Sequence, residues 1–109
     1  MATTYKVLGQ SNPSATTLTT LYTVPAATSA VCSTIAICNT AATAATVRVA
    51  IRPAGASITT AHYLVYDTSV AANDTVLLTV GVSLATTDVV SVYASSSTVV
   101  FQLFGAEVA

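Results

Sequence analysis

The sequence predicts an all-β fold: one antiparallel β-sandwich domain of about eight strands over residues 1–109. Val, Ile, Thr, Tyr and Phe, which favour strands, make up 47 of the 109 residues. Short segments rich in these types recur at intervals of roughly 8–14 residues, with turn residues between them. No window longer than ten residues carries the apolar stripe of an amphipathic helix. The length is that of a single domain.

Turn signals divide the chain into the expected strands. The strongest breaks are 11–14, Pro25, 53–56 and 71–74, where Pro, Gly, Asn or Asp interrupts the pattern. The predicted strands cover residues 4–10, 18–24, 30–39, 46–52, 61–67, 75–80, 88–94 and 98–104. This spacing is typical of both a jelly roll and an immunoglobulin-like Greek key, so the sequence leaves the topology open.

The two cysteines both fall in the predicted strand 30–39. Val31 and Ile35 are expected on one face of this strand, and Cys32 and Cys38 together on the other. Six extended residues separate the cysteines by roughly 20 Å, whereas a disulfide needs Cα atoms within about 7 Å. We therefore expect two free thiols.

The clearest alternation lies in 46–52 and places two of the three basic residues on one face. Val47, Val49 and Ile51 alternate with Arg48 and Arg52, as in a half-buried strand. One interpretation is that the arginines keep an exposed sheet face soluble. The other is that Arg48 and Arg52 contact an acidic partner, because guanidinium groups bind carboxylates in a forked geometry.

The residues that carry catalytic or metal chemistry are sparse. His62 is the only histidine, and in a strand over 61–67 it lies on the face opposite Asp67, the nearest acid. Asp74 and Asp88 fall at predicted turns, where Asp bonds to its own backbone. We interpret His62 as a hydrogen-bonded or half-exposed strand residue. No phosphate-binding or nucleophile motif is present, so we expect neither an enzyme nor a cofactor or metal site.

Composition excludes several classes of partner. The chain has three basic and four acidic residues, 6% of the sequence, where about 25% is usual. This is too little positive charge for binding nucleic acid or an anionic membrane surface. No apolar stretch is long enough for a transmembrane helix. At 53% hydrophobic residues, the chain is also not a disordered tail.

The same composition favours association with other proteins. Ala, Thr, Val and Ser fill 67 positions, so outward positions carry little solvating charge. Aromatic residues make up only 6% of the chain, which predicts a thin core. Both features favour a subunit that buries further area between chains.

Several segments are similar to those of one group of proteins. Residues 21–31 (LYTVPAATSAV) and 33–39 (STIAICN) resemble a segment of small virion proteins of tailed bacteriophages, cyanophages included. The same likeness extends over 49–55, 72–75, 87–94 and 101–107. Proteins of this type serve as head decoration (cement) proteins or as tail and fibre components.

The resemblance implies a non-enzymatic virion structural protein. The first expectation is a capsid decoration protein that clamps neighbouring capsomers, with the major capsid protein and further copies of itself, as a homotrimer, for partners. With no secretory signal at the start of the sequence, it is expected to fold in the host cytoplasm. One alternative is a tail, neck or fibre component. A more distant one is a carbohydrate- or ice-binding β module. Carbohydrate sites usually offer exposed Trp or Tyr platforms, of which Trp is absent, and the regular Thr ranks that ice binding needs are missing.

Overall fold

Eight antiparallel strands and two short 3₁₀ turns make up the described part of the chain. The computed structural model describes residues 2–109, apart from the side chain of Val80. The 3₁₀ turns, Pro53–Gly55 and Thr60–His62, both lie between the fourth and fifth strands. The strands are β1 (Thr3–Ser11), β2 (Thr19–Thr23), β3 (Ser29–Asn39), β4 (Ala45–Arg52), β5 (Tyr63–Val70), β6 (Thr75–Leu84), β7 (Val89–Ala94) and β8 (Val99–Val108).

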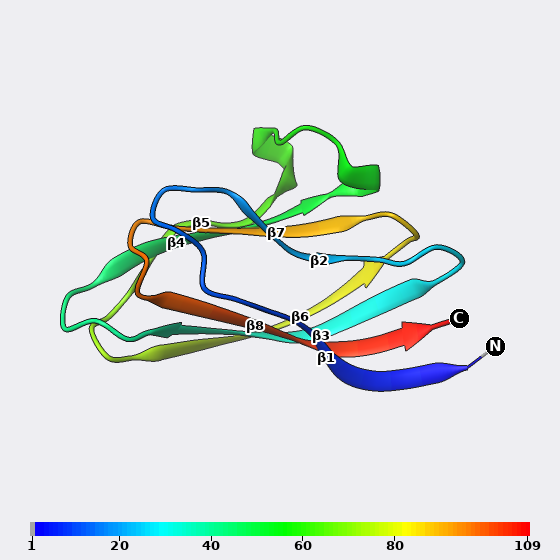
Figure 1. Cartoon of the computed structure of the whole chain (residues 1–109), viewed down its shortest axis with the longest axis horizontal. Helices are drawn as coiled ribbons and strands as arrows, with labels where there is room; N and C mark the ends of the chain where they lie inside the picture. The colour runs from blue at the N-terminus through cyan, green and yellow to red at the C-terminus, as the bar shows by residue number, and fades with distance from the viewer. Residues whose placement is uncertain (1) are drawn as a thin grey trace.

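The strands form two sheets that pack face to face (Figure 1). One sheet has the order β1-β8-β3-β6 and the other β2-β7-β4-β5. The pairs β1 with β8, β2 with β7, β3 with β6 and β4 with β5 are nested, as if one long hairpin were rolled around the core. This nesting is the jelly-roll topology. The predicted all-β sandwich is confirmed, and the jelly roll is the alternative adopted.

The core lies between the two sheets and closes within a single chain. Phe101, Leu103, Ile35 and Ile37 of the β1-β8-β3-β6 sheet are at most 2% exposed. They belong to one cluster with the buried valines of β4 and β7 from the other sheet. The accessible surface, 5374 Å², is close to the roughly 5,600 Å² expected for a compact chain of this mass. The chain is therefore as compact as its mass predicts, and its core forms within one monomer.

A β-bulge at Ser33 changes the predicted faces of β3. The register with both neighbouring strands shifts between Cys32 and Thr34. Cys32 is consequently buried, and beyond the bulge Ile35 takes over the inward position, so that Cys38 points outward. The prediction that the cysteines share a face was wrong, because an extra residue restarts the alternation. The prediction that both are free thiols is confirmed.

The segment predicted as strand 61–67 differs most from expectation. Thr60–His62 is a 3₁₀ turn, so β5 begins at Tyr63. Two register shifts against β4 follow, and Asp67 adopts a φ of 51°. These irregularities bring Asp67 to the same side as Tyr66, where both contact one arginine. The prediction that His62 and Asp67 lie on opposite faces of one strand was therefore wrong, because His62 belongs to the turn and the alternation of β5 is broken before Asp67.

The remaining strand limits follow the sequence closely, with two exceptions. β6 and β8 continue to Leu84 and Val108, beyond the predicted ends at residues 80 and 104. They can continue because β3, between them, pairs with both strands along its length. Within residues 2–109, no helix has the length and apolar character needed to cross a membrane.

One end of the sandwich is joined by the buried side chain of Asn39, which is 0% exposed. Its Nδ2 donates to the carbonyl oxygens of Thr43 at 2.8 Å and Val70 at 3.2 Å. Its Oδ1 accepts from the Ala41 N–H and the Thr98 hydroxyl, both at 3.1 Å. One carboxamide thus connects the β3–β4, β5–β6 and β7–β8 loops.

The other end carries the ion pair of the β1-β8-β3-β6 sheet. The Lys6 Nζ lies 2.8 Å from Glu107 Oε1, and the buried Tyr22 hydroxyl donates to Glu107 Oε2 at 2.5 Å. The Lys6 ammonium and the Tyr22 hydroxyl hold the pKa of Glu107 below its ordinary value. Burial, aided by the Glu107 carboxylate, raises the pKa of Tyr22. This cluster ties β2 of one sheet to β8 of the other.

Replacing Asn39 by Ala is expected to lower the free energy of unfolding by about 2–4 kcal/mol, because buried loop groups lose their partners. Chemical denaturation measures the change. Asn12→Ala is the matched control: the exposed Asn12 also donates to two carbonyls, of Ser97 and Val99, but water can replace it there. An equal loss in the free energy of unfolding for Asn39→Ala and Asn12→Ala would contradict the proposed role of Asn39 in connecting the three loops.

Glu107 should make stability fall in acid. A carboxyl whose pKa is lowered by folding contributes stability above its unfolded pKa of about 4.3, and this contribution is lost as pH falls through the folded value. We expect the free energy of unfolding of the wild type to drop more steeply below pH 5 than that of Glu107→Gln. Denaturation curves between pH 7 and 3 test this, and parallel pH dependences would refute it.

Candidate interaction surface

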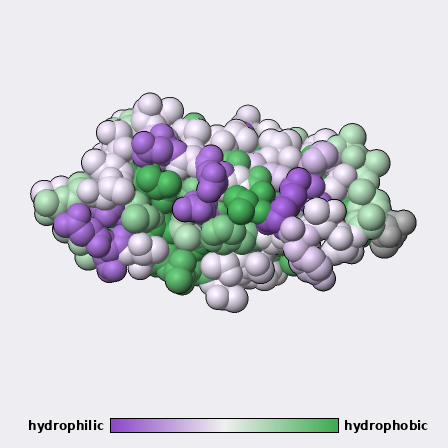
Figure 2. Space-filling model, turned by 60° about the horizontal axis from the view of Figure 1, so that its bottom comes forward, coloured by the Kyte–Doolittle hydropathy of each residue, from purple (hydrophilic) through white to green (hydrophobic). Residues whose placement is uncertain are grey.

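The outward surface of the β1-β8-β3-β6 sheet, called here the β8 face, carries exposed apolar side chains. Tyr5 is 84% exposed and Leu77 67%, with Val7 and Val31 also exposed. Figure 2 turns this sheet toward the viewer and shows apolar residues in the middle of the molecule, between polar ones. The strand registers place the following outward as well: Gln10, Thr34, Ala36, Cys38, Thr75, Thr79, Val100, Gln102, Phe104 and Ala106.

Among the described residues, no charged side chain points outward on the β8 face, and Lys6 lies at its edge beside the groove. Within the described residues, Lys6 and Glu107 bond to each other and, through Tyr22, to the other sheet. The other charged side chains lie on the opposite sheet or in turns: Arg48, Arg52, Asp67, Asp74 and Asp88. Burial of a four-stranded face with outward Val, Leu, Tyr and Phe but no ionised side chain costs only the desolvation of uncharged polar groups such as Gln10 and Gln102.

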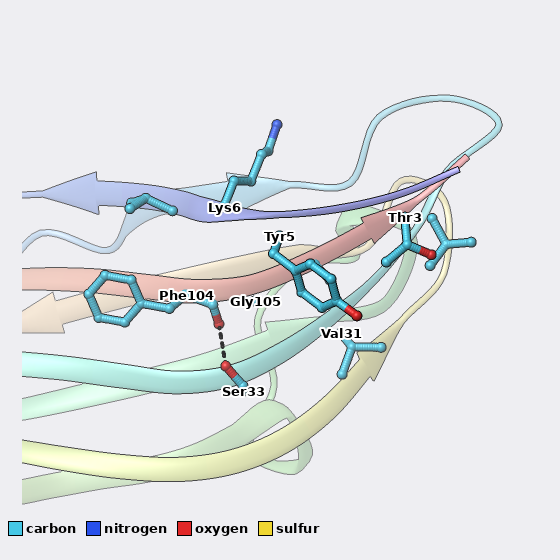
Figure 3. Close-up of a pocket in the computed structure, with 10 residues that line it drawn as sticks. Thr3, Tyr5, Lys6, Val31, Ser33, Phe104 and Gly105 are labelled. Carbon is cyan, nitrogen blue, oxygen red and sulfur yellow. Dashed lines mark hydrogen bonds between the residues drawn. The ribbon is translucent and has the colours of Figure 1, made fainter. Parts of the chain in front are cut away.

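A shallow groove lies on this face near the chain ends (Figure 3). The Tyr5 ring lies beside Gly105 and leans toward Val31, with Phe104 farther along β8, whereas the Lys6 side chain points away. Gly105 is required by close packing, because a Cβ there would stand 2.0 Å from the Val31 carbonyl oxygen. The groove floor at Gly105 is therefore backbone, and its walls are mostly apolar side chains, together with Thr3, Ser33 and Lys6.

Arg48, a predicted partner contact, lies on the other sheet and has partners within the chain. Its Nε and Nη2 donate to Asp67 at 2.6 and 3.2 Å. Its guanidinium lies 4.3 Å from the ring centres of both Tyr66 and Tyr93. The Arg48 guanidinium holds the pKa of Asp67 below its ordinary value, and the bond raises that of Arg48.

Arg52, the second predicted contact, secures the β4–β5 connection. Its Nε donates to the buried Ser91 hydroxyl at 3.1 Å, and its Nη1 to the Ala56 carbonyl at 3.2 Å. These bonds favour a structural role for both arginines. Contact of Arg48 or Arg52 with a partner stays a prediction.

The residues considered for catalysis do not converge. His62 Nδ1 accepts from the Thr59 N–H at 3.2 Å, and Asp67 is bonded to Arg48. Asp74 accepts from the N–H of Thr75, and Asp88 from that of Ala85, as predicted for turn residues. Among the described residues, no three His, Cys, Asp or Glu side chains are grouped as metal ligands.

Sequence reasoning missed the β8 face as a unit. The alternation of Tyr5 and Val7 around Lys6 was a signal within β1. The sequence could not predict that Val31 and Leu77 share this face with Tyr5 and Val7. The bulge in β3 and the register of β6 against β3 determine which residues of those two strands point outward. Comparison with protein-family models, curated proteins and solved structures finds no match to this chain.

The two thiols should react differently in the folded protein. Burial raises the pKa of the Cys32 thiol to about 11, so few molecules carry its thiolate at neutral pH. Cys38 is half-buried and points outward on the β8 face. We expect a thiol reagent to modify one group per native chain and two per unfolded chain, with peptide mapping locating the first at Cys38. Modification of Cys32 first would contradict the assigned faces of β3.

Proposed function

We propose that this protein is a non-enzymatic structural subunit of a virion, and that it docks through the β8 face. The observation that carries the proposal is the combination of apolar exposure and missing charge over one face of a closed sandwich. The likeness of several sequence segments to small proteins of tailed bacteriophages supports the virion as the setting. Within it, we favour a decoration protein that clamps neighbouring capsomers, with the tail, neck or fibre as the alternative position.

Docking of this kind depends on burial of apolar surface. Each Å² of apolar surface removed from water contributes about 25 cal/mol, and a standard interface buries about 800 Å² on each partner. The β8 face offers four strands for such contact, on a molecule with principal extents of 45 × 27 × 19 Å. Long-range attraction is weak because the net charge is only −1. Attachment should therefore persist at high salt.

The proposed partners are the major capsid protein and further copies of this chain as a trimer. In a trimer each copy contacts the next through two different surfaces, and a chain with a net charge of only −1 brings little repulsion to such contacts. Sedimentation of the purified protein tests this part by itself. A single species of monomer mass at micromolar concentration would rule out the trimer and leave docking to the particle as the remaining claim.

Added charge on the β8 face should weaken docking. Val31→Asp and Leu77→Asp are expected to lower occupancy on stripped virus particles at least about tenfold, because an unpaired carboxylate would be desolvated. Thr20→Asp is the matched control, since Thr20 is an exposed residue on β2 of the opposite sheet. Thr20→Asp should therefore bind like the wild type. Docking of the wild type should also cover Cys38 on the β8 face and protect it from the thiol reagent.

The same assay includes a salt series, because screening at 1 M reaches exposed ion pairs but not apolar contacts. Release of the wild type by moderate salt, or equal loss of occupancy for Thr20→Asp, would overturn docking through the β8 face.

A further inference from the structure

A second surface feature lies on the opposite side of the molecule, where the β4–β5 connection rises above the β2-β7-β4-β5 sheet (Figure 1). A groove there is lined by Ile58, Thr59, Thr60, Tyr63 and Tyr66. Two tyrosine rings and two threonines thus line one small depression, and no charged residue is among its lining residues.

The tyrosine wall of the groove is held in place by neighbouring groups. The Tyr63 and Tyr66 rings meet edge to face, with centres 4.8 Å apart. The Arg48 guanidinium stacks on Tyr66, and Asp67 fixes the guanidinium through two hydrogen bonds. Tyr66 is nevertheless 57% exposed. The ring is therefore oriented by its neighbours while much of its surface remains open.

The opposite wall is also anchored. Arg52 holds the Ala56 carbonyl, and the Asp88 carboxylate accepts from the Ala54 N–H at 2.9 Å. Farther along, Thr59 and His62 cap the 3₁₀ turn reciprocally. The connection is thus bonded at both its start and its end, so the groove exists before any ligand arrives, as small-molecule sites usually do.

The lining restricts the class of ligand. Five residues are far fewer than the 20–30 or so that a stable protein interface uses on each side, which favours a small ligand. The nearby Arg48 is already paired with Asp67, so among the described residues no unpaired cation is available there to bind a phosphate or carboxylate group. This disfavours an anionic ligand. Aromatic faces attract the slightly positive C–H groups of a ligand, and hydroxyl groups suit a partner with many donors and acceptors. A pyranose ring presents both an apolar C–H face and a rim of hydroxyls.

We propose that the groove between the β4–β5 connection and β5 is a binding site for a neutral saccharide, whose ring packs on Tyr66 and Tyr63 and whose hydroxyls meet Thr59 and Thr60. The site is separate from the β8 face and does not depend on the docking function.

Ligand-observed and protein-observed NMR test the proposal on the full chain. The probes are methyl glycosides of glucose, galactose, mannose and N-acetylglucosamine, with their neutral oligosaccharides, at millimolar concentrations. We expect at least one probe to shift the Tyr63 and Tyr66 signals saturably. Tyr66→Ala should weaken its binding at least about tenfold, whereas Tyr66→Phe should retain it, because the ring is kept.

Two further variants keep the outcome decisive. Ile58→Ala removes the apolar side chain of the other wall without touching the Arg48 contacts, and it should also weaken binding even if Tyr66→Ala loses the fold. Tyr5→Ala removes an exposed tyrosine from the β8 face and should bind like the wild type. The proposal is overturned if no saccharide shifts the two tyrosines, if only adenosine or a proline-rich peptide does so, or if Tyr5→Ala weakens binding equally.

Discussion

The Asn39 carboxamide is the polar constraint on which the arrangement of the strands most depends. In the described chain only Asn39 and Ser91 are buried polar residues. Asn39 bonds to three loops, and those loops begin or end six of the eight strands, β3 to β8. Apolar burial is non-directional, whereas a buried amide with defined donors and acceptors fixes the positions of its partners. Asn39 therefore holds the three loops at this end of the sandwich in one arrangement relative to each other.

The placement of the few charges explains why the two sheets present different surfaces. Lys6 and Glu107 belong to β1 and β8, yet they bond to each other and to Tyr22 of the opposite sheet. Arg48 and Asp67 pair on the outside of the β2-β7-β4-β5 sheet, and Arg52 secures the connection above it. Each of these charges bonds to a partner within the chain, and among the described residues none points outward on the β8 face.

The sequence predicts the fold class well and the candidate sites poorly, for one physical reason. Period-two patterns and turn residues mark eight strands, and most limits agree within one residue. Bulges leave no such mark in the sequence. Ser33, the bulge residue of β3, sits inside an unbroken alternation. The close approach that accompanies the bulge joins the Val31 carbonyl to Gly105, two residues that are far apart in the sequence. The same holds for Asp67, whose φ of 51° brings it to Arg48. Both surfaces depend on which side chains point outward, and bulges decide that.

The jelly roll also determines how the two surfaces relate. Two sheets packed back to back present their outer faces in opposite directions, and Figure 1 shows the β4–β5 connection on the side away from β1 and β8. A molecule docked through the β8 face would hold the tyrosine groove outward, toward solvent. The two proposals are thus compatible in a single subunit, and each can fail without the other. Because Arg48 and Asp67 contact only groups of the β2-β7-β4-β5 sheet, no hydrogen bond or ion pair of theirs links the groove to the β8 face.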